Sequence, residues 1–141
     1  MSKNKSFETL KKYFGNRWSV SPSDLENHGR SESYFPIHAP DAVVYPMSTE
    51  DVVFLVNVCQ EAKIPLIGYG IGTSLEGHTA AINGGICVDF SKMSKVLEID
   101  PQNLLATLEP GVTREQLNKE LRHSGLFFSV DPGANATLGG M

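Results

Sequence analysis

A stretch of glycines and hydroxyl residues, GYGIGTSLEGHT, runs from residue 68 to residue 79, directly after an apolar segment at residues 64–67. Glycines let backbone N–H groups converge on an anion, and serine and threonine hydroxyls add further donors. The stretch nearly fits the P-loop pattern of nucleoside-triphosphate-binding proteins, but His78 stands where that pattern needs lysine. No Lys or Arg lies between Lys63 and Lys92, so the pattern disfavours a kinase or ATPase and indicates an uncharged cradle for a pyrophosphate.

The dinucleotide fingerprint G-x-G-x-x-G also fails, because Thr73 takes the place of the third glycine and no obvious helix follows. Taken alone, the first loop is explained equally well by glycines that only turn the chain between strands. A second segment, DPGANATLGG, begins at residue 131 and again lies in a part of the chain without basic residues, since none follows Arg122. Two such loops after apolar strands indicate a long ligand with a central diphosphate, for which a flavin dinucleotide is a good candidate.

Composition limits the other possibilities. A chain of 141 residues is the length of one domain and can bury roughly two-thirds of its unfolded surface. Its formal charge of -4, with no basic cluster, disfavours nucleic-acid binding. Cys59 and Cys87 have no metal-ligand spacing and lie in apolar contexts, which predicts buried, reduced thiols and a reducing compartment. We therefore expect a cytoplasmic protein without a metal.

The N-terminal residues have neither a signal-peptide pattern nor a run of about 18 apolar residues, so export and a membrane span are not expected. Phe7, Leu10 and Phe14 follow helical spacing among several lysines. We expect this helix to pack on its own domain; the alternative is a face that lies peripherally on a membrane surface.

The elements that would position the first loop form a strand-helix-strand unit. Residues 1–40 are expected to form a helix followed by a loop, and residues 42–45 a strand. A helix then runs from the Ser48 N-cap to about Lys63, with Val52, Val56 and Cys59 on its apolar face, which residues 53–55 widen. A second strand at residues 65–69 places the loop at a carboxyl end, where open α/β sheets bind ligands.

The remainder of the chain predicts an antiparallel arrangement, giving an α+β fold. Strands at 86–90, 96–100 and 104–109 are too close together for intervening helices. A helix begins at Thr113, with Gln116 completing a capping box and Val112 packing on Leu117, and it ends at Gly125. A last strand at residues 126–130 leads into the second loop.

Several consecutive blocks of this sequence resemble the N-terminal FAD-binding domain of the FAD-linked oxidases, the PCMH or vanillyl-alcohol-oxidase type. They are PDAVVYPMSTEDV, PLIGYGIGTSLEGH, GGICVDFSKM and LEPGVTREQLNKELRHSGLFFSVDPGANATLGGM. The resemblance runs from about residue 28 to residue 141. Within this family the blocks are most similar to the group that contains the D-lactate dehydrogenases (cytochrome) and the flavin-binding glycolate oxidase proteins.

The resemblance implies a small parallel strand-helix lobe packed on a larger, mainly antiparallel lobe, with FAD between them. It implies an N-terminal helix and loop at 1–40 and the N-terminal part of the FAD-binding domain at 41–141. Carried over by position, the pyrophosphate loop and the second FAD-lining segment comprise Tyr69, Gly70, Ile71, Gly72, Thr73, Ser74, Gly77, His78, Pro110, Asp131, Pro132, Gly133, Thr137, Gly139 and Gly140.

Three positions of the first loop bear on how FAD would be held. Many relatives carry arginine where Tyr69 stands, so phosphate affinity there is lost or supplied from elsewhere. Other branches attach the flavin through a histidine whose place Thr73 occupies, which predicts non-covalent FAD. His78 either contacts FAD or only holds the loop by a hydrogen bond.

The implied function is the FAD-binding portion of a flavin-dependent D-2-hydroxyacid dehydrogenase, in which a hydride passes from the substrate α-carbon to flavin N5 and electrons pass on to a cytochrome or quinone. In the family the substrate domain and further FAD contacts follow the GGM block, so no catalytic residue is expected within 1–141. The alternatives are an alkyl-dihydroxyacetonephosphate synthase-like transferase and a stand-alone binding module. A homo-oligomer is compatible with the sequence, and an apolar face near residues 126–128 is expected to be exposed.

Overall fold

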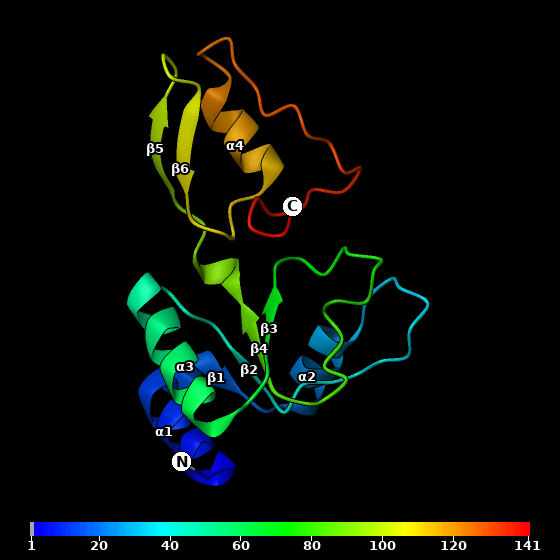
Figure 1. The fold of residues 1–141 in the computed structure, drawn as a ribbon. Helices are drawn as coiled ribbons and strands as arrows, with labels where there is room; N and C mark the ends of the chain where they lie inside the picture. The colour runs from blue at the N-terminus through cyan, green and yellow to red at the C-terminus, as the bar shows by residue number, and fades with distance from the viewer. Residues whose placement is uncertain (1) are drawn as a thin grey trace.

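A computed structural model describes residues 2–141 as two lobes that meet near residue 93 (Figure 1). The first lobe contains a four-stranded sheet with helices on both sides. The second contains a two-stranded sheet, one helix and the C-terminal segment. Both lobes mix helix and strand in open sheets, as the α+β expectation requires, and within residues 2–141 the lobe with parallel strands is the larger.

The first sheet has the strand order β1-β2-β4-β3, formed by β1 (Trp18–Ser19), β2 (Ala42–Val44), β4 (Ile86–Asp89) and β3 (Leu66–Tyr69). β2, β4 and β3 are parallel, and β1 pairs antiparallel with β2 at the edge. All three apolar residues of β2 and all four residues of β4 are buried, as expected for strands covered on both faces.

The expectation that the strand at residues 86–90 belongs to an antiparallel array is wrong. β4 inserts between β2 and β3 and runs parallel to both. The chain returns from the end of β3 to the start of β4 through the irregular residues 70–85, which are long enough for a parallel crossover without a helix. The first glycine loop is therefore the crossover connection itself.

Two helices, α1 (Lys3–Phe14) and α3 (Thr49–Ala62), lie on one side of the sheet, and α2 (Pro22–Gly29) lies on the other (Figure 1). Leu10 and Phe14 of α1 are almost fully buried against the sheet core. The apolar face of the N-terminal helix thus packs within its own lobe, as expected. No helix among residues 2–141 is both long enough and apolar enough to cross a bilayer.

The N-terminal forty residues contain more structure than one helix and a loop. β1 and α2 were not expected, although α2 carries a readable signal: the Ser21 hydroxyl accepts a hydrogen bond from the Asp24 N–H, and Pro22 occupies the first turn. The short run of residues after Pro22 has too few apolar positions to show a helical period. Burial under the sheet, rather than periodicity, supports this helix.

The buried face of α3 is rotated from the expected one. Leu55, Val58 and Cys59 are buried, whereas Val56 is exposed. Every residue from 52 to 59 except Asn57 is apolar, so periodicity alone left the inward face ambiguous. The Ser48 N-cap is confirmed, since its hydroxyl accepts a hydrogen bond from the Asp51 N–H. The helix ends at Ala62, and the next residue, Lys63, has a left-handed backbone conformation.

The second lobe pairs β5 (Val96–Asp100) antiparallel with β6 (Leu105–Leu108), beside α4 (Arg114–Leu121). Thr113 caps α4, and Val112 and Leu117 pack together, as expected. Gln116 does not complete a capping box, because its amide donates to the Ser94 carbonyl, 2.8 Å away. The helix ends at Leu121, and Gly125 serves a following turn with φ +74°.

Residues 126–130 do not form the expected strand. The backbone of Phe128 hydrogen-bonds to the Asn118 side chain, with its N–H 2.7 Å from Asn118 Oδ1, instead of pairing with a neighbouring strand. The segment is thus held by α4 in an extended but unpaired form. Residues 126–130 have strand composition, but they pair with no strand in the part of the chain that the structure describes.

Both cysteines are free and buried, as expected. Burial raises the pKa of Cys59 to about 11 and that of Cys87 to about 12, which keeps both thiols protonated and unreactive near neutral pH.

An apolar groove of about 650 Å³ crosses the second lobe between the sheet and residues 125–128. Phe127 is 74% exposed and Leu105 is 64% exposed. We expect this groove to bind a hydrophobic fluorescent dye and to promote self-association of the 141-residue chain. A double variant, Leu105→Ser with Phe127→Ser, should lower dye fluorescence severalfold, while a dye-silent, strictly monomeric unmodified chain would contradict the prediction.

Candidate functional site

The two glycine loops line a single cavity of about 240 Å³ between the lobes. The first lobe contributes the end of β3, the loop after it and the residue after β4. The second contributes Pro110 and the C-terminal segment. The lining residues are Gly68, Tyr69, Gly70, Ile71, Gly72, Thr73, Ser74, His78, Thr79, Phe90, Pro110, Thr137, Gly139 and Gly140.

The first loop depends on a position that only glycine can occupy without strain. Gly72 has φ +71°, and a Cβ there would lie 2.3 Å from the Tyr69 hydroxyl. Ser74 Oγ and His78 Nδ1 are 3.1 Å apart, and the same hydroxyl accepts from the Glu76 N–H. His78 therefore holds the loop by a hydrogen bond and also lines the cavity.

The second loop is fixed to the start of α4. Thr137 is buried and forms an antiparallel bridge with Thr113, and the Gly139 N–H donates to the Pro110 carbonyl, 3.0 Å away. The loops also approach each other closely, since a Cβ on Gly70 would lie 2.3 Å from Thr137 Oγ1. The glycines thus allow two lobes to close around one narrow space.

Four of the residues expected at the site lie outside this cavity: Gly77, Asp131, Pro132 and Gly133. Gly77 turns the chain against Phe35, whose ring would meet a Cβ there at 2.5 Å. Asp131 lies 3.5 Å from the Arg114 guanidinium and accepts a hydrogen bond from the Gly133 N–H. Their contact with the cofactor stays a prediction.

Gly68, Thr79 and Phe90 line the cavity but were not expected there. Gly68 and Thr79 are the first and last residues of the glycine stretch itself, but the positions carried over from the family resemblance did not include them. Phe90 follows β4 and could be placed only by knowing that β4 lies beside β3.

The donor chemistry of the cavity suits a diphosphate. The lining includes the glycines of the first loop and the hydroxyl residues Thr73, Ser74 and Thr137, and it contains no Lys or Arg. The N–H groups of Gly139 and Gly140 are donated within the second loop and to Pro110, so backbone donors for a ligand would come from the first loop. Its volume is below the roughly 300–1,000 Å³ of pockets that enclose a whole ligand, so it fits the central part of an elongated dinucleotide. Within residues 2–141 no cluster of His, Cys, Asp or Glu side chains could hold a metal ion.

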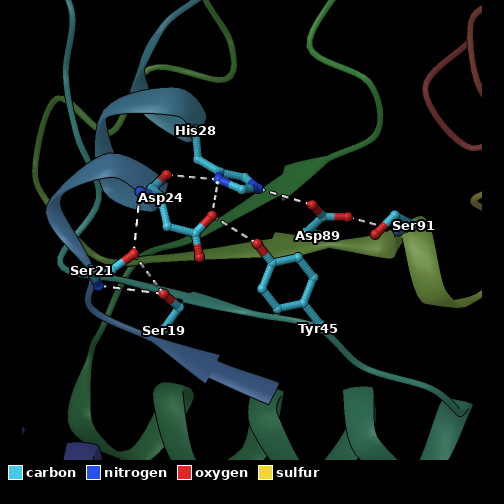
Figure 2. Close-up of polar contacts among 7 residues, drawn as sticks. All are labelled: Ser19, Ser21, Asp24, His28, Tyr45, Asp89 and Ser91. Atoms are coloured by element: carbon cyan, nitrogen blue, oxygen red, sulfur yellow. Dashed lines mark hydrogen bonds and ion pairs between the residues drawn. The ribbon is translucent and has the colours of Figure 1, made fainter. Parts of the chain in front are cut away.

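Asp24, His28, Tyr45 and Asp89 form a polar cluster next to the cavity, in which His28 and Asp89 are buried and the other two are half-buried (Figure 2). His28 Nε2 is 2.9 Å from Asp89 Oδ2, and His28 Nδ1 is 2.8 Å from the Asp24 carbonyl oxygen. The Tyr45 hydroxyl donates to the Asp24 carboxylate at 2.9 Å. No local sequence pattern reveals this cluster, because His28 and Asp89 are 61 positions apart.

The family of this chain is shown by comparison with known protein families. Residues 40–141 match the family model described as "FAD binding domain". The chain therefore belongs to this family of FAD-binding domains, as the resemblance of its sequence blocks indicated.

Among curated relatives, the chain is 46% identical over 123 residues to a zebrafish protein (Danio rerio) named "Probable D-lactate dehydrogenase, mitochondrial", with 87% of this chain and 25% of the relative covered. It is 41% identical to an Arabidopsis thaliana D-lactate dehydrogenase [cytochrome], over 81% of this chain and 20% of the relative. It is 37% identical to glycolate oxidase subunit GlcD of Bacillus subtilis, covering 72% and 22%. The chain thus spans about a quarter or less of these relatives.

Solved structures share the fold. An alkyldihydroxyacetonephosphate synthase superposes with a TM-score of 0.87 at 24% identity, covering 99% of this chain and 31% of that chain. p-Cresol methylhydroxylase gives a TM-score of 0.76 at 29% identity, covering 87% and 25%. The two-lobed α+β architecture implied by the family resemblance is thereby confirmed.

Proposed function

We propose that this chain is the FAD-binding portion of a flavin-dependent D-2-hydroxyacid dehydrogenase of the D-lactate or glycolate type. The observation that carries the proposal is that two glycine-rich loops from separate lobes line one cation-free cavity, in a chain that belongs to an FAD-binding family. The names of its relatives, D-lactate dehydrogenases and a glycolate oxidase protein, support the substrate class.

In this proposal the first loop holds the diphosphate through backbone N–H groups and the Thr73 and Ser74 hydroxyls. Thr137, Gly139 and Gly140 close the second side, with Pro110 as their support. The remaining contacts are assigned to Tyr69, Gly70, Ile71, Gly72 and His78. When bound, FAD supplies the hydride acceptor for oxidation of the 2-hydroxy acid.

We place the substrate-binding and catalytic groups outside residues 1–141, because the matched region covers a quarter or less of the relatives' length. A cytochrome or quinone-type electron acceptor would also bind elsewhere. The division at residue 40, a homo-oligomeric state and a cytoplasmic or peripheral membrane location belong to the same proposal.

The direct test is a flavin-fluorescence titration of the purified 141-residue chain with FAD, with FMN and ATP as controls and an absorbance scan for flavin carried through purification. We expect saturable FAD binding that neither control reproduces. If FAD does not bind this chain or a chain extended beyond Met141, the cradle assignment fails.

FAD should be held without a covalent bond, because Thr73, a poor nucleophile toward a flavin, stands where related branches carry the attaching histidine. Acid precipitation of the flavin-loaded chain is expected to leave a colourless pellet and a yellow supernatant. A yellow pellet would contradict this prediction.

Two alternatives remain to be tested. An alkyl-dihydroxyacetonephosphate synthase-like transferase has the same fold, but at 24% identity that likeness concerns the fold alone. Reduction of bound flavin by D-lactate or glycolate in the longer protein would favour the dehydrogenase over the transferase. A stand-alone binding module predicts FAD binding with no flavin reduction by any 2-hydroxy acid in either form.

A further inference from the structure

The His28 ring is held so that both of its nitrogens face oxygen atoms, Asp89 Oδ2 on one side and the Asp24 carbonyl on the other (Figure 2). A neutral imidazole has only one N–H to donate, whereas an imidazolium has two. Since His28 is only 7% exposed, water does not replace a missing donor. The geometry therefore favours the charged ring.

Burial lowers the pKa of His28, but the hydrogen bonds to Asp89 and to the Asp24 carbonyl outweigh it, so the net pKa is raised above the ordinary 6.5. Burial also opposes the ionisation of Asp89, yet the hydrogen bonds from His28 and Ser91 outweigh it and lower the pKa of Asp89 below its ordinary value. The titratable groups that face His28 come from α2, β4, β3 and the segment after β2. They are Asp24, Asp89, Tyr69 and Tyr45.

This cluster is joined to the cavity by two routes. The rings of His28 and Tyr69 have centroids 4.6 Å apart, and Tyr69 lines the cavity. Asp89 pairs in register with Tyr69 across the β3–β4 ladder and is followed by the lining residue Phe90. The His28–Asp89 pair thus contacts one lining residue, Tyr69, and immediately precedes another, Phe90.

The charge of the cluster matters because the cavity lining has no Lys or Arg. With His28 protonated, its positive charge offsets one of the two carboxylate charges of Asp24 and Asp89. Loss of that proton leaves two uncompensated carboxylates behind the cradle, and their field disfavours an anionic ligand.

We propose that the buried His28–Asp89 pair is a positioning and charge-balancing element of the cradle, so that affinity for the FAD diphosphate falls when His28 loses its proton. The inference rests on the proposed function, FAD binding at this cavity. By linkage, a ligand that binds better to the protonated form must in turn favour protonation of His28 by the same factor.

The test measures FAD affinity of the 141-residue chain by flavin fluorescence from about pH 6 to pH 9. We expect the Kd to rise by about tenfold through the His28 titration, which corresponds to a shift of about one pH unit in the His28 titration on FAD binding. Proton NMR of the histidine ring signals, with and without saturating FAD, measures that shift in the unmodified chain. This second measurement requires no variant to fold.

His28→Gln keeps a donor in the cluster and removes the titrating charge, so its Kd should be independent of pH over the same range. Tyr45→Phe removes a hydrogen bond of the same cluster without altering charge and should retain the pH dependence. His78→Asn removes the titratable side chain of the loop itself and should also retain it.

The outcomes separate the two proposals. FAD binding with a Kd that is constant from about pH 6 to pH 9, or a His28 titration that FAD does not shift, overturns the role of His28 and leaves the cradle in place. The role of His28 is also overturned if the pH dependence of the FAD Kd disappears in His78→Asn and persists in His28→Gln. Absence of FAD binding at every pH overturns the proposed function, and this inference with it.

Discussion

Gly139→Ala is expected to weaken FAD binding by about tenfold or more, which corresponds to ~1.4 kcal/mol. A Cβ at this position would lie 2.6 Å from Pro110 Cβ and 2.7 Å from the Pro110 carbonyl oxygen, which also accepts the Gly139 N–H. Because Pro110 is rigid and its backbone belongs to the junction between β6 and α4, the second loop must move instead. That movement opens the cradle on the side that Gly139 and Gly140 line.

The matched control is Gly125→Asn, in the same lobe. A Cβ at Gly125 meets no atom within 4 Å, and asparagine tolerates the positive φ of +74° there. Isothermal titration of both variants with FAD, together with their thermal unfolding midpoints, separates lost binding from lost folding. Equal FAD affinity in Gly139→Ala and the unmodified chain would show that the second loop does not contribute to the cradle.

Asp89→Ala is expected to lower the free energy of unfolding by about 3 kcal/mol, because it removes the carboxylate that faces Nε2 of the buried His28 and leaves only Asp24 as a charge partner of the ring. The substitution also removes the acceptor for the Ser91 N–H, 2.7 Å from Asp89 Oδ1, which begins the 3-10 turn η2 (Phe90–Lys92). Urea unfolding near pH 6 measures the loss. A change below about 1 kcal/mol would mean that the His28–Asp89 contact contributes little.

The His28–Asp89 pair also determines how the free energy of unfolding changes with pH. The pKa of His28 is raised, so its contribution is complete below the unfolded value of 6.5 and is lost as the pH rises through the folded value. The pKa of Asp89 is lowered, so its contribution is present above the unfolded value of 3.8 and is lost as the pH falls through the folded value. Stability from the pair is therefore greatest between about pH 4 and about pH 6.5, and Asp89→Ala should flatten the profile at both ends.

Tyr45→Phe is the control for this substitution, since it removes one neutral donor to the half-buried Asp24 carboxylate and should cost only about 1.5 kcal/mol. An equal loss in Tyr45→Phe and Asp89→Ala would indicate that packing in the cluster, rather than charge, controls stability.

The sequence by itself determined the local features of this protein. Capping residues located the starts of α3 and α4, as Ser48 and Thr113 show. Histidine at position 78, where a P-loop needs lysine, disfavoured a kinase or ATPase, and the two glycine loops lie in sequence blocks that carried the family resemblance. These features can be predicted from the sequence because each depends on residues within a few positions of one another.

Only the tertiary structure decided which distant segments meet. The insertion of β4 between β2 and β3 turned the first glycine loop into a parallel crossover and brought Phe90 to the cavity. The pairing of His28 with Asp89 joined α2 to the end of β4. Periodicity reports which face of one element is apolar, but strand order and the approach of two lobes are selected by burial and hydrogen bonding over the whole chain, so no local pattern contains them.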